Sequence, residues 1–254
     1  MEISTSERNK TIQKRTVMKT LKITFLLGLI SLTINAQKII EKNIDFKNQY
    51  VEVDLKFASE IAVKTWDKNT VYFKAEINTK DGKFLDAYKL DLKETSDRIS
   101  IISEAEGVFK KFQDEWNANN KDQKKRYYNS GDWYTFNYAL YVPKNAKFKV
   151  SSINGDLSSD ILEGDFTADL INGNISIKSY SGNLNLTTIN GEIDLKMVNA
   201  NLVAETIHGD IYADEKLKFN SEDRHVGQKI SGQIAEGKNR LRLNTINGNM
   251  YLRL

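Results

Sequence analysis

The chain has 254 residues, 40% of them hydrophobic and none of them cysteine, so it is long enough for one large domain but has no disulfides. Thiol nucleophiles and Cys-His metal sites are therefore excluded. The formal net charge is +3, but residues 1–36 carry six basic and two acidic side chains, and the remainder holds 31 basic and 32 acidic residues. This near-neutral remainder argues against bulk attraction to nucleic acid.

The N-terminal residues have the pattern of a secretory signal. A short basic stretch that begins at Met18 is followed by an apolar run over 23–34 and by a small residue, Ala36. This order is typical of a signal peptide. The run is shorter than the roughly 20 residues that span a bilayer, so a cleaved signal is favoured over an uncleaved anchor. We predict a targeting segment at 1–36 that starts effectively at Met18, with cleavage after Ala36 and no membrane span in the mature, exported protein.

Three stretches before the repeat predict β-strands. Apolar residues alternate along 50–79, for example at Val51 and Val53, and again along 88–102. A third alternating run covers 134–142 and ends at Pro143, the only proline. Alternation with a period of two places one set of side chains on the inner face of a sheet. We expect an N-terminal β-rich portion without a fixed repeat.

The charged segment 104–132 interrupts this pattern. We predict an exposed insertion that is partly helical near 109–116. Its aromatic residues are interleaved with lysine and arginine, and exposed aromatic rings stack well against ligands. The candidate ligand-contact residues are Trp116, Tyr127, Tyr128 and Trp133. The alternative is an ordinary solvated loop whose aromatic side chains pack against the protein.

A nine-residue repeat follows. Ala200 fills one gap in a series of evenly spaced glycines, which are Gly155, Gly164, Gly173, Gly182, Gly191 and Gly209. The first and fifth positions of each unit are apolar, as at Ile189 and Ile193, and we expect both columns to point inward. Corners that read Ile-Asn-Gly or Ile-His-Gly recur in every second unit. The expected fold is all-β, a parallel β-solenoid with 18-residue coils of two strands.

An antiparallel meander is the alternative, because Asn-Gly also marks hairpins. In a two-residue hairpin, positions 1 and 4 of a unit would face the same side, yet position 1 is apolar and position 4 is Asp, Asn or Glu in most units. The solenoid is therefore favoured.

Corner-like pieces at 230–234 and 246–249 predict further coils. The stretch 250–254 reads as a last strand whose exposed edge needs protection. Residues 37–254 would form one domain.

These features together resemble the putative-adhesin family of exported bacterial proteins, a domain of unknown function numbered 4097 (DUF4097). The matching residues are the corners over 154–211, the strand end 63–67, the segment 141–145 and the closing corner 246–249. The resemblance covers roughly 40–254 as a periodic pattern. It implies a β-solenoid at the cell envelope and supplies no binding residues. The end of the signal resembles those of Bacteroidetes.

Residues that could carry chemistry are sparse. His208 replaces Asn in a corner, and His225 lies in a polar segment, so we interpret both as non-catalytic. No serine lies in Gly-x-Ser-x-Gly. The corner acids are compared with calcium-binding β-rolls, but each unit has one glycine and often Asn in place of Asp, which favours a stacked Asn/Asp ladder.

The sequence therefore predicts a protein that is not an enzyme and has no cofactor or metal. We expect a non-catalytic, exported cell-envelope protein, an adhesin-like binding or scaffold module in the periplasm, at the outer-membrane surface or outside the cell. Its partner would be a glycan or an envelope protein, not nucleic acid. The alternative is a carbohydrate-active β-helix enzyme acting on a polysaccharide, which would need clustered acids on one outward face. A third possibility is a purely structural element of an envelope assembly.

Overall fold

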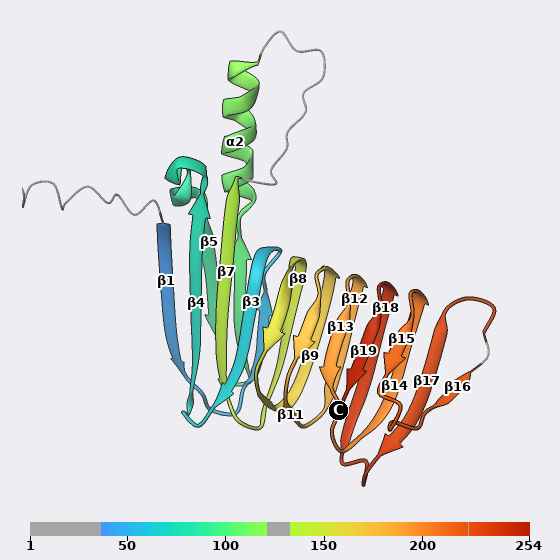
Figure 1. Ribbon diagram of the computed structural model, residues 1–254. Helices are drawn as coiled ribbons and strands as arrows, with labels where there is room; N and C mark the ends of the chain where they lie inside the picture. Colours follow the sequence, from blue (N-terminus) through green and yellow to red (C-terminus); the bar gives the residue numbers. More distant parts are fainter. Residues whose placement is uncertain (1–36, 121–132, 223) are drawn as a thin grey trace, which may run out of the picture. The chain divides into compact units, whose positions relative to one another are not determined.

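The computed structural model describes residues 37–120, 133–222 and 224–254 (Figure 1). The predicted targeting segment 1–36 lies outside these residues. Within the described residues, strands form one open, mixed β-sheet that folds into two layers, with the apolar core between them. The all-β class is therefore confirmed.

Strand order in the first layer follows from the pairings between neighbouring strands. Its neighbours, in order, are β1 (Gln37–Asp45), β4 (Thr70–Thr79), β7 (Tyr134–Pro143), β3 (Phe57–Trp66), the second half of β8 (Ala146–Ser159), β10 (Ile175–Ile177), β13 (Ile193–Lys196), β19 (Met250–Arg253) and β15 (Ile211–Ala213).

The second layer begins with a hairpin and ends with one. Its neighbours, in order, are β5 (Lys89–Glu94), β6 (Arg98–Glu104), β2 (Tyr50–Asp54), the first half of β8, β9 (Leu162–Asn172), β12 (Leu184–Asn190), β18 (Asn239–Asn247), β14 (Ala200–His208), β17 (Gln228–Ile234) and β16 (Asn220–Glu222). The short β11 (Tyr180–Ser181) pairs with the start of β9. The remaining elements are η1 (Lys80–Gly82), η2 (Leu85–Ala87) and the helix α2 (Glu106–Asn119).

Alternating apolar residues form the strands as expected. Along β4, Val71, Phe73, Ala75 and Ile77 are all fully buried, and the residues between them face outward. In the repeat, parallel strands pair residues that lie two repeat units apart in the sequence. Leu157 on β8, Ile175 on β10 and Ile193 on β13 therefore stack in register. At the sheet ends, however, β4 runs antiparallel to β1 and β7, and β17 runs antiparallel to β14. Because the sheet is mixed, the parallel β-solenoid of two-strand coils is not confirmed.

The prediction that the first and fifth positions of each repeat unit both point inward is only partly right. The fifth-position residues are buried from Leu157 to Leu202, but several first-position residues are not: Ile171 and Ile207 are each 40% exposed. The residue before a corner takes the inward position instead. The buried Thr188 donates a hydrogen bond to the Gly173 carbonyl oxygen at 2.8 Å, so the next residue, Ile189, lies at the surface side of the strand.

The corners themselves stack through glycine and asparagine. A Cβ at Gly191 would lie 2.0 Å from the carbonyl oxygen of Gly173, so no larger residue fits there without moving backbone. The expected ladder lies at the fourth position of the units, where Asn174 N–H donates to Asp156 Oδ1 and Glu192 N–H donates to Asn174 Oδ1, both at 2.8 Å. A second ladder, which was not expected, lies at the second position: each of three asparagines donates from Nδ2 to Oδ1 of the next, at 2.7–3.1 Å, and the series is Asn247, Asn190, Asn172 and Asn154. His208 lies in register with Asn247, as a substituted corner residue would.

The last two strands, β18 and β19, do not stack after the preceding coil in sequence order. Strand β18 pairs in parallel with β12 on one side and with β14 on the other, so Asn247 lies opposite Asn190, which belongs to a much earlier unit of the repeat. In Figure 1, β18 and β19 accordingly lie between the coil of β12 and β13 and the coil of β14 and β15. We call 239–253 the inserted coil. The expectation that 250–254 forms an exposed edge strand is therefore wrong, and 230–234 belongs to the antiparallel β17 rather than to another coil.

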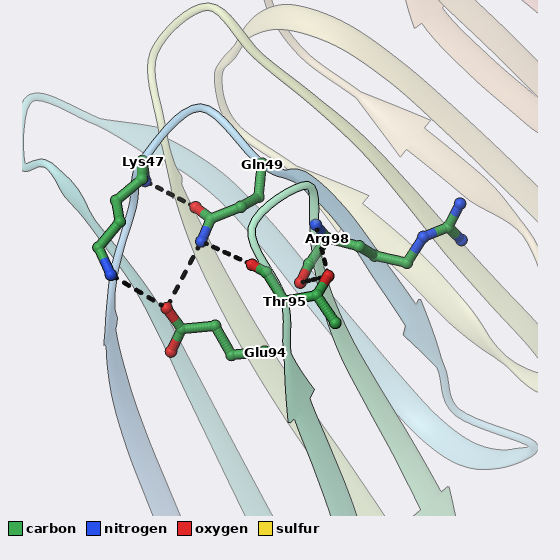
Figure 2. Close-up of polar contacts among 5 residues, drawn as sticks. All are labelled: Lys47, Gln49, Glu94, Thr95 and Arg98. Carbon is green, nitrogen blue, oxygen red and sulfur yellow. Dashed lines mark hydrogen bonds and ion pairs between the residues drawn. The ribbon is translucent and has the colours of Figure 1, made fainter.

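A polar network closes the N-terminal part of the core (Figure 2). Gln49 is 2% exposed, yet its side chain accepts a hydrogen bond from the Lys47 backbone at 2.6 Å and donates to the Thr95 carbonyl oxygen at 3.3 Å. Thr95 Oγ1 in turn accepts from the Arg98 backbone N–H at 3.1 Å. These bonds tie the turn before β2 to the β5–β6 hairpin, and they satisfy an amide that would otherwise be buried without partners.

Candidate functional site

The predicted insertion contains the expected helix, and its aromatic side chains divide into two groups. In α2, Val108 and Phe112 are buried and Trp116 is half-buried. Trp133 packs edge-on against Phe112, with ring centroids 5.3 Å apart, and the Lys80 ammonium lies 5.6 Å from its ring centre. Trp133 therefore contributes to packing beneath the helix. Tyr127 and Tyr128 lie outside the described residues, and ligand contact by these residues and Trp116 stays a prediction.

A shallow trough lies elsewhere, on the outer side of the first layer. Four small residues follow one another across neighbouring strands, because Ala139 pairs with Ala62, Ala62 with Ser158, and Ser158 with Ser176. They come from β7, β3, β8 and β10. Outward positions on strands normally carry longer polar side chains, so this row of small residues hollows the surface across the strands. We call it the trough.

An aromatic cluster forms one wall of the trough. The ring centroids of Trp66 and Tyr141 lie 5.2 Å apart, and those of Tyr72 and Tyr141 lie 5.7 Å apart in an edge-on arrangement. Trp66 Nε1 donates to the Thr70 carbonyl oxygen at 2.8 Å, and the Lys68 ammonium lies 4.6 Å from the indole centre. The indole is thus held in place on the surface, and all three aromatic residues of the cluster are half-buried.

The opposite wall is polar. Asn137 lies between Glu60 and Glu76 in the strand register. The Asn137 Oδ1 atom is buried and accepts no hydrogen bond from the residues the structure describes. Lys74, which borders the floor, holds Glu76 in an ion pair at 2.5 Å. A buried acceptor without a partner is unusual, and a hydroxyl or amide donor entering the trough would satisfy it.

The electrostatics of the trough keep its aromatic wall neutral. Burial, together with the nearby Glu41 carboxylate, raises the pKa of the Tyr72 hydroxyl, which therefore stays protonated as a hydrogen-bond donor near neutral pH. The hydrogen bond to Glu76 raises the pKa of Lys74 and keeps it cationic. Apart from the Lys68 ammonium over the indole, the wall therefore offers a hydroxyl donor and ring faces.

The trough is large enough for part of a chain-like ligand. Its main section, between the aromatic cluster and Asn137, encloses about 740 Å³. A smaller section of about 200 Å³ continues over Ser158 and Ser176 toward Lys178, and the two sections share Ala62, Tyr141 and Ser158. The continuous hollow runs perpendicular to the strands, which suits an elongated molecule.

Other kinds of site receive no support from the described residues. Both histidines are exposed, and His208 lies opposite the corner residue Asn247 in the strand register. No group of three or more His, Asp or Glu side chains in the described ranges is placed to hold a metal ion. None of the helices described is both long and apolar enough to cross a bilayer.

The fold defines an all-β protein with a stacked repeat, and comparison with known proteins agrees at this level. No protein-family model and no curated protein matches the sequence. A putative cell adhesion protein from Clostridium sporogenes, known from its crystal structure, aligns with 85% of this chain and 99% of its own, at a TM-score of 0.52 and 11% identity. This likeness shows a shared fold.

Two further structural similarities are weaker. A putative adhesin from Bacteroides fragilis aligns with 85% of this chain and 97% of its own, at a TM-score of 0.38 and 10% identity. A putative lipid binding protein from Parabacteroides distasonis covers 85% of this chain and 96% of its own, at a TM-score of 0.23 and 9% identity.

Sequence reasoning missed the aromatic cluster, although a sequence signal for it exists. Trp66, Tyr72 and Tyr141 each occupy an outward position of an alternating strand, next to buried residues such as Thr65, Val71 and Leu140. Bulky aromatic residues at outward positions are a recognisable pattern. That the three meet depends on β3 and β4 both pairing with β7, which the alternation alone does not indicate.

Proposed function

We propose that this chain is an exported, non-catalytic binding module of the cell envelope, and that the trough holds an elongated glycan. In this proposal residues 1–36 are a signal peptide, 37–254 form one domain with an insertion at 104–132, and the repeat from β8 to β19 is a β-solenoid whose ends are closed by antiparallel strands. The fold shared with a putative cell adhesion protein is consistent with an adhesin-like role.

The observation that carries the proposal is the pairing of an aromatic wall with a polar wall across a floor of small residues. Sugar rings have apolar faces, which stack on aromatic side chains, and hydroxyl groups, which form hydrogen bonds with amides and carboxylates. Trp66 and Tyr141 supply the ring faces, and Asn137 with Glu60 supplies acceptors. A rigid sheet positions all of them in advance, which lowers the entropic cost of binding.

A glycan array probed with the full chain tests this proposal, followed by titration of the best neutral glycan. Trp66→Ala and Tyr141→Ala should each weaken binding by at least about tenfold, which is roughly 1.4 kcal/mol. Tyr212→Ala is the matched control, because Tyr212 is an exposed tyrosine stacked on Tyr251 at the far end of the same layer. Trp116→Ala tests the predicted contact in the insertion. Binding that is lost only in Trp116→Ala would move the site from the trough to the insertion.

A carbohydrate-active enzyme is the second candidate, and one observation favours examining it. Glu60 and Glu76 flank Asn137, two strand spacings or about 10 Å apart at the backbone. Inverting glycosidases place two carboxyl groups about 6.5–9.5 Å apart across the scissile bond. Release of reducing ends from the bound glycan, abolished in Glu60→Gln, would establish the enzyme and overturn the non-catalytic proposal.

A further inference from the structure

A second groove lies on the outer side of the second layer. It encloses about 620 Å³ and crosses the strands from β8 to β14. We call it the arginine groove. The residues that the argument uses are Lys147, Thr167, Asn185, Arg240, Arg242 and Asn244.

Two arginines lie at the centre of the arginine groove because of the inserted coil. Arg242 on β18 is in register with Asn185 on β12 and with Val203 on β14. Arg240 precedes it by two residues, so both side chains point outward from one strand, about 7 Å apart at the backbone. If the coils had stacked in sequence order, β12 and β14 would be neighbours and neither arginine would lie between them.

The acidic side chains at the arginine groove already have other partners. The Asp165 carboxylate accepts a hydrogen bond from Asn183 Nδ2 at 2.8 Å, and Glu205 forms an ion pair with Arg224 at 2.5 Å. Arg240 and Arg242 form no ion pair with any residue in the described ranges. Two adjacent guanidinium groups without carboxylates repel each other, so an anion placed between them is favoured.

The surrounding side chains narrow the chemistry of that anion. Thr167, Asn185 and Asn244 offer hydroxyl and amide groups at the level of the arginines. These groups suit a ligand that carries many hydroxyls as well as charge. A guanidinium forms two parallel hydrogen bonds with a carboxylate, which a lysine cannot do. The groove extends over four strand spacings, about 19 Å, so a linear polymer would contact it along its length.

We propose that the arginine groove binds an acidic polysaccharide, whose uronic-acid carboxylates pair with Arg240 and Arg242. This site lies on the opposite layer from the trough and does not depend on the proposed function of the trough. Asn185, Asn244 and Thr167 bind sugar hydroxyls, and Lys147 adds positive charge on β8.

Titration of the full chain with polygalacturonate oligomers tests the site. Arg240→Gln and Arg242→Gln should each weaken binding at least about tenfold. Lys110→Gln removes the same charge from an exposed position on α2 and should leave binding unchanged. The methyl-esterified oligomer has the same backbone without the charge and should not bind. Urea unfolding of each variant confirms an intact fold.

The opposite results overturn the proposal. Binding of the esterified oligomer as tight as that of the acid would exclude carboxylate recognition. Phosphatidylglycerol vesicles that bind in an Arg242-dependent manner, with no binding of the oligomer, would identify an anionic lipid as the occupant instead. Trp66→Ala, which disables the trough, should bind polygalacturonate normally, so failure of one site is distinguishable from failure of the other.

Discussion

Gly191→Ala tests the corner packing most directly. A Cβ at position 191 would lie 2.0 Å from the carbonyl oxygen of Gly173 and 2.6 Å from its carbonyl carbon, and both are backbone atoms held in the ladder. Gly191 is not among the glycines with positive φ, so alanine meets a steric conflict and no dihedral penalty. The corner backbone must therefore separate from the neighbouring coil.

The size of the effect follows from the bonds at this corner. Gly191 N–H donates to the Asn247 carbonyl oxygen at 3.1 Å, Gly173 N–H donates to that of Asn190 at 3.1 Å, and Thr188 Oγ1 donates to the Gly173 carbonyl oxygen at 2.8 Å. Hydrogen bonds contribute about 1 kcal/mol each, and overpacking costs about 1–3 kcal/mol. Loss of two of these bonds with moderate overpacking gives an expected decrease in the free energy of unfolding of about 3–5 kcal/mol.

Urea unfolding followed by circular dichroism measures this decrease. Gly107→Ala is the control, because Gly107 lies in the first turn of α2, where alanine is a better helix former and the nearest atom to a new Cβ is 3.1 Å away. The control should change stability by less than about 1 kcal/mol. If Gly191→Ala is as stable as this control, the close approach of stacked glycine corners is wrong.

Three further predictions concern other parts of the molecule. Gln49→Leu removes a buried amide that joins Lys47 to Thr95, and should lower the free energy of unfolding by about 1–3 kcal/mol, measured by urea unfolding. Burial raises the pKa of Tyr180 from 10.0 to about 12, so the unfolded chain loses this proton first and stability should fall as the pH rises from 10 to 12. Tyr180→Phe should reduce that fall in alkaline unfolding experiments, and an unchanged pH dependence would contradict the assignment. Removal of 238–254 should lower the protection of the β12 and β14 amides against hydrogen exchange, because direct pairing of β14 with β12 would replace only one of the two strand interfaces that β18 forms, whereas trimming of a true end coil would leave the protection of β14 unchanged.

Local pattern predicts much of the fold. The alternation at Val71 and Phe73, and the fifth-position column with Ile175 and Ile193, fix which side chains are buried. The burial of the first-position residues could not be predicted in the same way, because the chain can turn at a corner either before or after the aliphatic residue. Only the inward Thr188 hydroxyl, bonded to the preceding coil, decides between the two.

The order of the coils could not be predicted for a different reason. The corner at Asn247 has the same Ile-Asn-Gly sequence as that at Asn190, so the corner sequence alone does not determine the stacking order. The position of the inserted coil is set by contacts far along the chain, such as the antiparallel cover of β14 by β17. The arginine groove depends wholly on that order, and for this reason no local pattern indicates it.

The inserted coil also has a consequence for how the protein reaches its final form. Before residues 239–253 are in place, β14 can dock directly on β12 with an offset of two repeat units, because both carry interchangeable corners. We expect that non-native pairing to compete with the native one during folding, and it would have to open again to admit β18. Folding should therefore include a slow step, in which β18 displaces β14 from β12 and takes its place between the two strands.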